Sequence, residues 1–207
     1  MQPPLAAFLE QVLATAQAGL TYSQDPFDIA RFEALRNAAA TLVASQSELD
    51  PEAIAHWIAL DSGYPTPKLD VRALILDDAG RLLLVQERSD GLWTLPGGWC
   101  DIGDSPAGAV VRELVEETGL ECRAVQLLAL FDKLKHPHPP QLPHAHKAFF
   151  LCEVTGGALL TETDETRGAS YFPIDALPPL SRHRVVESQL RSLHDHVRQG
   201  RRHTLFA

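Results

Sequence analysis

The sequence has few of the features that mark secreted or membrane proteins. Its 207 residues include only three cysteines, Cys100, Cys122 and Cys152, which cannot all pair and show no metal-type spacing. We therefore expect reduced thiols and a cytoplasmic protein. Residues 1–20 lack the basic start and long apolar core of a secretory signal, and no apolar run approaches membrane-spanning length. We expect no membrane partner.

Basic residues are also in the minority. There are 18 lysines and arginines against 27 aspartates and glutamates, which gives a formal net charge of -9. Nucleic acids and anionic membranes are bound mainly through positive surface, so the charge makes a nucleic-acid partner unlikely. An acidic protein can still act on an anionic substrate if metal ions mediate the contact. The hydrophobic content of 45% and charged content of 22% are ordinary for a globular chain.

The most informative stretch is residues 95–120, with the sequence LPGGWCDIGDSPAGAVVRELVEETGL. Its Pro-Gly-Gly at 96–98 predicts a tight turn with exposed main-chain groups. Ser105 followed by Pro106 predicts the start of a helix, because a hydroxyl caps the first turn and proline suits the first helical position. Gly119 predicts its end.

This helix carries a group of three acidic side chains. Glu113, Glu116 and Glu117 fall within an arc of roughly 100° on a helical wheel. The expected packing face is on the other side, formed by Ala107, Val111, Leu114 and Thr118. The three carboxylates repel one another unless cations lie between them, and a hard divalent ion such as Mg²⁺ prefers carboxylate oxygens. By itself, the E-x-x-E-E pattern is more typical of a solvated acidic face than of a metal site.

The longer pattern is more specific. Gly98, five residues, Asp104 and seven residues precede the sequence RELVEETGL of residues 112–120. This resembles the signature box of the Nudix hydrolases, G-x5-E-x7-R-E-U-x-E-E-x-G-U, where U is aliphatic. Every fixed position matches except Asp104, which stands in place of glutamate. The resemblance implies an α/β class protein with the Nudix α/β/α sandwich and a mixed sheet. It also implies hydrolysis of a nucleoside diphosphate linked to another group, X.

The resemblance also implies roles for individual residues. Glu113, Glu116 and Glu117, with the main-chain carbonyl of Gly97, would hold Mg²⁺ or Mn²⁺, and one of the glutamates would act as the base. Arg112 would orient these carboxylates. In the family, the position of Asp104 supports the helix through an ion pair with the box arginine. The aspartate keeps the charge but reaches one methylene less, and we expect activity to survive.

Other candidates lie outside the box. Many Nudix enzymes add a carboxylate from a late loop, and Glu165 in the segment TETDETR is our choice, although this segment also fits a solvated acidic loop. The His- and Pro-rich loop 135–146 suggests a mobile cover whose substrate contacts are Lys133, Lys135 and His136. An ordinary exposed loop is the alternative, and zinc binding is a weaker one.

Two further residues flank the box. Arg88 is a candidate contact of a substrate phosphate, and Trp93 of the base. Both residue types serve equally well as scaffold, which is the stronger alternative for Trp93.

The hydrophobic pattern of the sequence changes near residue 63. Residues 1–62 predict a small domain of three amphipathic helices, with starts near Leu5, Asp25 and Asp50, the first ending at Gly19. The segment from Gly19 resembles the N-terminal extension of one Nudix subgroup, in which it is associated with dimerisation and closure of the substrate pocket. We therefore expect a homodimer. Residues 63–67 form a linker, and 68–207 the Nudix domain.

Within residues 68–207, hydrophobic patterning predicts the order of elements. We expect a hairpin of residues 71–75 and 82–85 around a turn at 77–80, and a helix through 185–197. The other expected strands are 93–95, 122–131, 147–154 and 171–172.

The sequence indicates the identity of X less directly than it indicates the type of reaction. The type of N-terminal extension resembles that of CDP-choline pyrophosphatases, so the first expectation is CDP-choline or a similar CDP-alcohol, giving CMP and the phospho-alcohol. The alternative is an ADP-ribose pyrophosphatase. An alternative of another class is a non-catalytic module that senses a nucleotide sugar, although all three box glutamates are intact.

Overall fold

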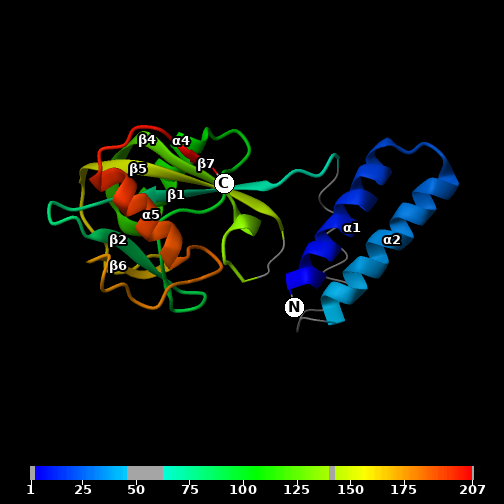
Figure 1. Ribbon diagram of the computed structural model, residues 1–207, viewed down its shortest axis with the longest axis horizontal. Coiled ribbons are helices and arrows are strands. Elements are labelled where there is room, and N and C mark those ends of the chain that lie inside the picture. The colour runs from blue at the N-terminus through cyan, green and yellow to red at the C-terminus, as the bar shows by residue number, and fades with distance from the viewer. Residues whose placement is uncertain (1–2, 46–62, 140–142, 207) are drawn as a thin grey trace. The chain divides into compact units, whose positions relative to one another are not determined.

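The computed structural model describes residues 3–45, 63–139 and 143–206 (Figure 1). By its internal contacts the chain forms two units. The first contains residues 1–67 with 140–144, and the second contains residues 68–139 and 145–207. None of the described helices is both long and apolar enough to cross a membrane.

The first unit is built on two paired helices, α1 (Pro3–Tyr22) and α2 (Pro26–Ser45). Asp25 caps α2, because its carboxylate accepts hydrogen bonds from the N–H groups of Phe27 and Asp28 at 2.9 and 3.0 Å. The start of the second expected helix is thereby confirmed. The third expected helix, after Asp50, lies outside the described residues.

The expected end of the first helix at Gly19 is wrong, because α1 continues to Tyr22. A Cβ atom on Gly19 would lie 2.5 Å from the ring of Phe32 on α2. Gly19 therefore permits close approach of the two helices, and its role is packing rather than termination.

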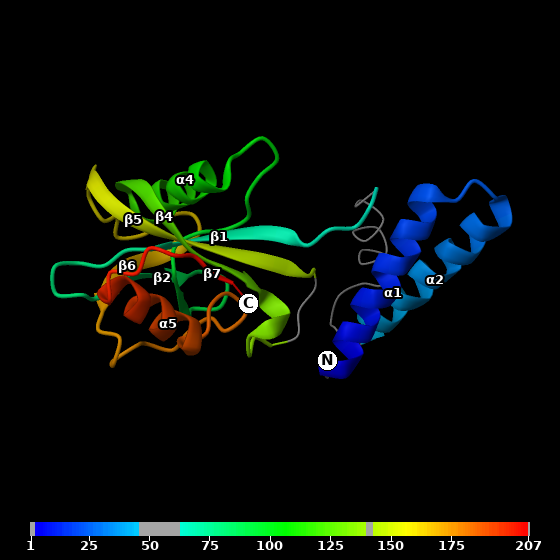
Figure 2. The same cartoon turned by 45° about the horizontal axis from the view of Figure 1, so that its top comes forward.

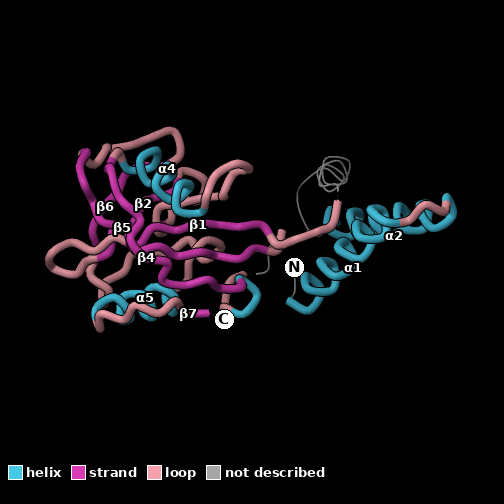
Figure 3. The backbone as a smooth tube through the Cα atoms, turned by 90° about the horizontal axis from the view of Figure 1, so that it is seen from above, coloured by secondary structure: helices cyan, strands magenta, loops and turns pink. Residues whose placement is uncertain are grey.

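The second unit contains two sheets (Figures 2 and 3). One has the strand order β1-β5-β4-β7, with β1 parallel to β5 and β4 antiparallel to it, and the other has the order β3-β2-β6. The strands are β1 (Lys68–Leu74), β2 (Leu82–Glu87), β3 (Trp93–Thr94), β4 (Leu120–Asp132), β5 (Ala145–Gly157), β6 (Thr166–Phe172) and β7 (Leu205–Phe206). The mixed sheet expected from the resemblance is confirmed.

The expected hairpin near residue 78 is only partly correct. The turn exists, with the N–H of Gly80 donating to the carbonyl of Asp77 at 2.8 Å. However, β1 and β2 belong to different sheets, since β1 pairs with β5 along its whole length and β2 pairs with β6. Local alternation cannot distinguish a hairpin from two strands that diverge to enclose a core.

Two helices cover the sheets from opposite sides. Figure 2 shows the strands between α4 (Pro106–Thr118) and α5 (Glu187–Arg198). One buried cluster, including Val71, Val110 and Leu114, lies between α4 and the strands. A second cluster, including Leu84, Leu128, Leu190 and Leu193, lies on the α5 side. This α/β/α arrangement fixes α4 and the turn before it against β1.

Candidate active site

The bounds of α4 follow from its capping residues. The side chain of Ser105 accepts a hydrogen bond from the N–H of Gly108 at 3.1 Å. Gly119 has φ 76°, in the left-handed region, and its N–H donates to the carbonyl of Val115. Both ends expected from the sequence are therefore confirmed. The helix presents its carboxylates at defined positions.

Burial of α4 differs from the expected pattern. Glu113 and Glu117 are only 9% and 4% exposed, whereas Glu116 is exposed. The expected packing face is partly wrong, because Ala107 is exposed and Val110 is buried instead. The helix is in contact with protein on its carboxylate side as well, where the turn before it lies. Two of the three carboxylates are thus not a solvated face.

The turn at 96–98 lies directly against these two carboxylates. The Oε2 atom of Glu117 accepts a hydrogen bond from the N–H of Gly97 at 2.7 Å. A Cβ atom on Gly98 would lie 2.7 Å from Oε2 of Glu113, and one on Gly97 would lie 2.1 Å from the carbonyl oxygen of Val71. Gly97 also has φ 134°. Only glycine fits here, and three of the expected metal ligands are brought together.

Arg112 connects the acidic groups around the helix start. Its guanidinium forms ion pairs with four carboxylates. They are Asp101 (3.3 Å), Asp104 (3.3 Å), Glu113 (3.0 Å) and Glu116 (2.9 Å). Asp104 therefore reaches the arginine despite its shorter side chain. Fixing Glu113 and Glu116 from one side leaves their other oxygens for another cation.

The buried carboxylates have perturbed acidities. Burial raises the pKa of Glu117 to about 8, against the opposing effects of Arg72 and of the hydrogen bond from Gly97. Burial also raises the pKa of Glu113, although the positive charge of Arg112 opposes the shift. A divalent cation at this position would favour the ionised forms of both. The donor set therefore fits Mg²⁺ or Mn²⁺, which take carboxylate and carbonyl oxygens.

One acidic residue of this region was not anticipated from the sequence. Glu87, at the end of β2, is 7% exposed and forms an ion pair with Arg184 at 2.9 Å. Burial raises the pKa of its carboxyl, and its charge in turn raises that of Glu117. A polar residue closing an apolar strand was the only sequence signal, and it is a weak one.

Glu165 and Arg88 lie in neighbouring loops. The negative charge of the exposed Glu165 contributes to the raised pKa values of both Glu113 and Glu87. The N–H of Arg88 donates to the carbonyl of Glu165 at 2.9 Å. The guanidinium of Arg88 binds the carbonyl of Thr163 at 2.7 Å and pairs with Glu162 at 3.0 Å. Arg88 therefore holds the loop that carries Glu165.

The remaining candidates lie around the His- and Pro-rich loop and β3. Lys133 is buried and Lys135 exposed, both in a short 3₁₀ turn (Lys133–Lys135). The ring of His136 lies 4.4 Å from that of Phe131. Trp93 packs edge-on against Phe172 at 4.7 Å and belongs to the α5-side core, which is the packing of a scaffold residue.

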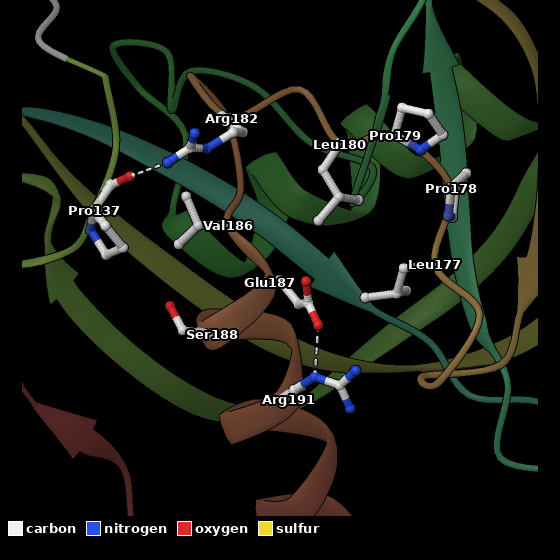
Figure 4. Close-up of a pocket in the computed structure, with 10 residues that line it drawn as sticks. All are labelled: Pro137, Leu177, Pro178, Pro179, Leu180, Arg182, Val186, Glu187, Ser188 and Arg191. Carbon is white, nitrogen blue, oxygen red and sulfur yellow. Dashed lines mark hydrogen bonds and ion pairs between the residues drawn. The ribbon is translucent and has the colours of Figure 1, made fainter.

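A cavity of about 630 Å³ lies beside the start of α5 (Figure 4). Apolar side chains line most of it, including Pro137, Leu177 and Val186, together with the charged Arg182, Glu187 and Arg191. Arg182 donates to the carbonyl of Pro137 at 3.2 Å, which ties the His- and Pro-rich loop to this wall. No carboxylate of the α4 group lines the cavity.

Comparison with known proteins agrees with this geometry. The model of the NUDIX domain matches residues 66–194, more than half of the chain. The chain is a Nudix hydrolase. Residues 3–58 match a second model, described as a UDP-X-like N-terminal oligomerisation domain.

Among relatives of this Nudix hydrolase, a putative ADP-ribose pyrophosphatase (YjhB) of Bacillus subtilis is 45% identical over 197 residues, covering 95% of this chain and 94% of the relative. A crystal structure of a UDP-X diphosphatase covers 100% of both chains, with 34% identity and a TM-score of 0.64. An ADP-ribose pyrophosphatase structure from Streptococcus suis covers 69% of this chain and 100% of its own, with 40% identity and a TM-score of 0.61.

Membership of the Nudix family identifies the segment that contains the α4 carboxylates. Residues 98–120 form the Nudix box, and the protein is a pyrophosphohydrolase of this family. Membership of an enzyme family with close relatives named as pyrophosphatases replaces the alternative of a non-catalytic sensing module.

Proposed function

We propose that the protein hydrolyses the pyrophosphate bridge of a nucleoside diphosphate linked to a group X, releasing a nucleoside monophosphate and phospho-X. The observation that carries this proposal is the contact between the 96–98 turn and the carboxylates of Glu113 and Glu117. Two buried acids beside a main-chain turn make a site suited to a hard cation and, through it, to phosphate oxygens.

Glu113, Glu116, Glu117 and the carbonyl of Gly97 would hold Mg²⁺ or Mn²⁺. When bound, the metal supplies neutralisation of phosphate charge and a water of lowered pKa. Arg112 fixes the orientation of Glu113 and Glu116 through its ion pairs at 3.0 and 2.9 Å. The exposed Glu165 is our candidate for the additional carboxylate that accepts a proton from the attacking water. Its neighbour Thr166 donates a side-chain hydrogen bond to the main-chain carbonyl of Glu117 at 3.0 Å, which brings this loop to the end of α4.

The names of the relatives reduce the number of candidates for the group X. Those described above are named for ADP-ribose and for UDP-linked substrates. We therefore place ADP-ribose first and UDP-linked compounds second. CDP-choline, the first expectation from the sequence, follows them because none of these named relatives is described as a CDP-choline enzyme.

A hydrolysis screen tests this ranking. ADP-ribose, UDP-glucose, CDP-choline, NADH and the nucleoside triphosphates would be compared at equal concentration with Mg²⁺ and with Mn²⁺, and products would be identified by chromatography. We expect AMP and ribose 5-phosphate from ADP-ribose as the leading products. Preference for CDP-choline would restore the first expectation. Release of inorganic phosphate or pyrophosphate from triphosphates alone would contradict the proposed substrate class.

We further propose that the N-terminal unit makes the protein a homodimer in the cytoplasm. The support is the match of residues 3–58 to an oligomerisation domain. Large apolar side chains on its helices are also exposed in the single chain, among them Phe8 (61%), Tyr22 (71%) and Phe27 (71%). Exposed large apolar side chains on a domain of this description favour an interface.

A further inference from the structure

A group of buried charges beside the Nudix box has no part in the chemistry proposed above. Asp70 and Arg72 on β1 and Lys147 on β5 are 5%, 4% and 2% exposed. Asp70 and Lys147 are register partners in the parallel pairing of the two strands. Removing three charges from water is expensive unless each is paired with good geometry.

Asp70 is the centre of the group. Its carboxylate accepts hydrogen bonds from Nε and Nη2 of Arg72 at 3.0 and 2.8 Å, and from Nζ of Lys147 at 2.6 Å. Two parallel bonds fix the plane of the Arg72 guanidinium. The same two cations hold the pKa of Asp70 down at about 2, although burial alone would raise it. The aspartate is therefore a permanent anchor for Arg72.

The remaining edge of the guanidinium is directed at the segment just before the Nudix box. Nη1 of Arg72 donates to the carbonyl of Leu95 at 3.1 Å, immediately before the 96–98 turn. The neighbouring residues of β1 hold the same turn through main-chain bonds. The N–H of Val71 donates to the carbonyl of Gly98, and that of Ala73 to the carbonyl of Pro96, both at 2.8 Å. Three successive residues of β1 thus fix the turn.

We propose that Arg72 is a positioning residue of the metal centre, which fixes the turn through Leu95 and so places Gly97 relative to the Glu117 carboxylate. This inference rests on the proposed function, since it takes Gly97 and Glu117 as metal ligands. Arg72 does not touch the substrate and acts through the turn. Lys147 balances the charge of Asp70 through an ion pair at 2.6 Å, and among the described residues its side chain makes no hydrogen bond to the turn.

The charge of Arg72 is suited to this position. It favours the ionised form of Glu117 and, less directly, of Glu87. Burial opposes the charge of the guanidinium, but the carboxylates around it, Asp70 first, raise its pKa. An arginine is needed because a lysine has a single nitrogen and lacks the planar fork that binds both oxygens of Asp70 while a third nitrogen reaches Leu95.

The test is the affinity of the substrate-free protein for Mn²⁺, measured by electron paramagnetic resonance. Arg72→Lys keeps the charge and should weaken Mn²⁺ binding about 10- to 100-fold, as is typical when an outer-shell partner is lost. With saturating metal, it should lower kcat while leaving KM nearly unchanged. Lys147→Met is the matched control, because it removes an equally buried charge from Asp70. It should lower thermal stability but retain the wild-type Mn²⁺ affinity.

A second variant covers the case in which Arg72→Lys does not fold. Asp70→Asn keeps the shape of the anchor but removes its charge, and it should weaken Mn²⁺ binding in the same direction. Wild-type Mn²⁺ affinity in a folded Arg72→Lys or Asp70→Asn protein would overturn the inference, as would equal loss in Lys147→Met. If the wild type binds Mn²⁺ but hydrolyses no nucleotide, the proposed function is wrong. The Mn²⁺ affinities of the variants still show whether Arg72 positions the metal ligands.

Discussion

The carboxylate of Glu117 accepts a hydrogen bond from the main-chain N–H of Gly97 at 2.7 Å, across twenty residues of sequence. The bond joins the end of the Nudix helix to the turn that precedes it. Because Glu117 is 4% exposed, its carboxylate has little water to stabilise its charge. The stability of the folded protein therefore depends on whether this carboxylate is protonated.

Glu117 predicts a pH-dependent stability of the metal-free protein. Its pKa in the folded state is about 8, raised by burial from an ordinary value of 4.5. The folded state therefore holds a proton that the unfolded chain has lost, and this contribution is present below pH 4.5 and disappears as pH rises through about 8. Urea unfolding of the metal-free protein from about pH 5 to pH 9 should show falling stability.

Glu117→Gln should remove much of that slope, because glutamine keeps the shape without the titration. Glu113 and Glu87, whose pKa values are also raised, account for what remains. Added Mg²⁺ should flatten the wild-type curve at high pH by favouring the ionised carboxylate. Parallel curves for the wild type and Glu117→Gln would contradict this account of the buried acid.

The two glycines of the turn should fail in different ways when replaced. Gly97→Ala places its Cβ against the main-chain oxygen of Val71 at 2.1 Å, with φ 134°. A main-chain oxygen cannot move aside, so we expect a loss of about 2 kcal/mol or more in unfolding free energy. Gly98→Ala meets the end of the Glu113 side chain, which can move.

Gly98→Ala should therefore keep most of the stability but displace a metal ligand and weaken Mn²⁺ binding. Thermal melts and Mn²⁺ titrations of both variants check the contrast. The account is wrong if Gly98→Ala binds Mn²⁺ as the wild type does.

The late acidic loop offers a matched pair of glutamates. Glu165 acts electrostatically on Glu113, whereas Glu162 is exposed and paired with Arg88 at 3.0 Å. Glu165→Gln should lower kcat at least about 10-fold if its carboxylate accepts a proton in the reaction, with little change in stability. Glu162→Gln should change kcat only slightly. Equal effects of the two substitutions would assign the loop a purely structural role.

The exposed apolar side chains of α1 and α2 predict self-association. Light scattering at micromolar concentration should report a dimer. Phe27→Asp places a charge on one of the two most exposed of these side chains and should shift the mass toward that of a monomer. Val125→Asp, at a 37% exposed position on β4, is the control and should remain dimeric. A monomeric wild type would refute the expected homodimer.

The sequence predicted the local structure around α4 better than it predicted the sheets. Ser105, Pro106 and Gly119 determine the bounds of α4 by local capping, so these bounds could be read from a short segment. The glycine turn and the arrangement of the glutamates followed from the box. The separation of β1 and β2 into two sheets depends on pairing with β5 and β6, more than seventy residues away, which local alternation does not encode.

The buried charged residues beside the site could not be predicted from the sequence either. Asp70 and Arg72 look like polar positions of an ordinary strand, and Lys147 begins the apolar run of another. Only the parallel register of β1 and β5 brings them together. Gly19 was misinterpreted for a related reason. A glycine at this point usually indicates the end of a helix, but here it provides space for the ring of Phe32 on the neighbouring helix. Both cases depend on contacts between distant segments.

The most direct test of the central claim is the turnover number of Glu117→Gln with Mg²⁺ on the best substrate of the screen. Glu153→Gln, an exposed strand residue paired with Arg123 at 2.7 Å, is the control. We predict that Glu117→Gln loses at least about 100-fold in kcat while remaining folded, and that Glu153→Gln matches the wild type. Turnover by Glu117→Gln at the wild-type rate would contradict the assignment of the catalytic centre to the Nudix helix.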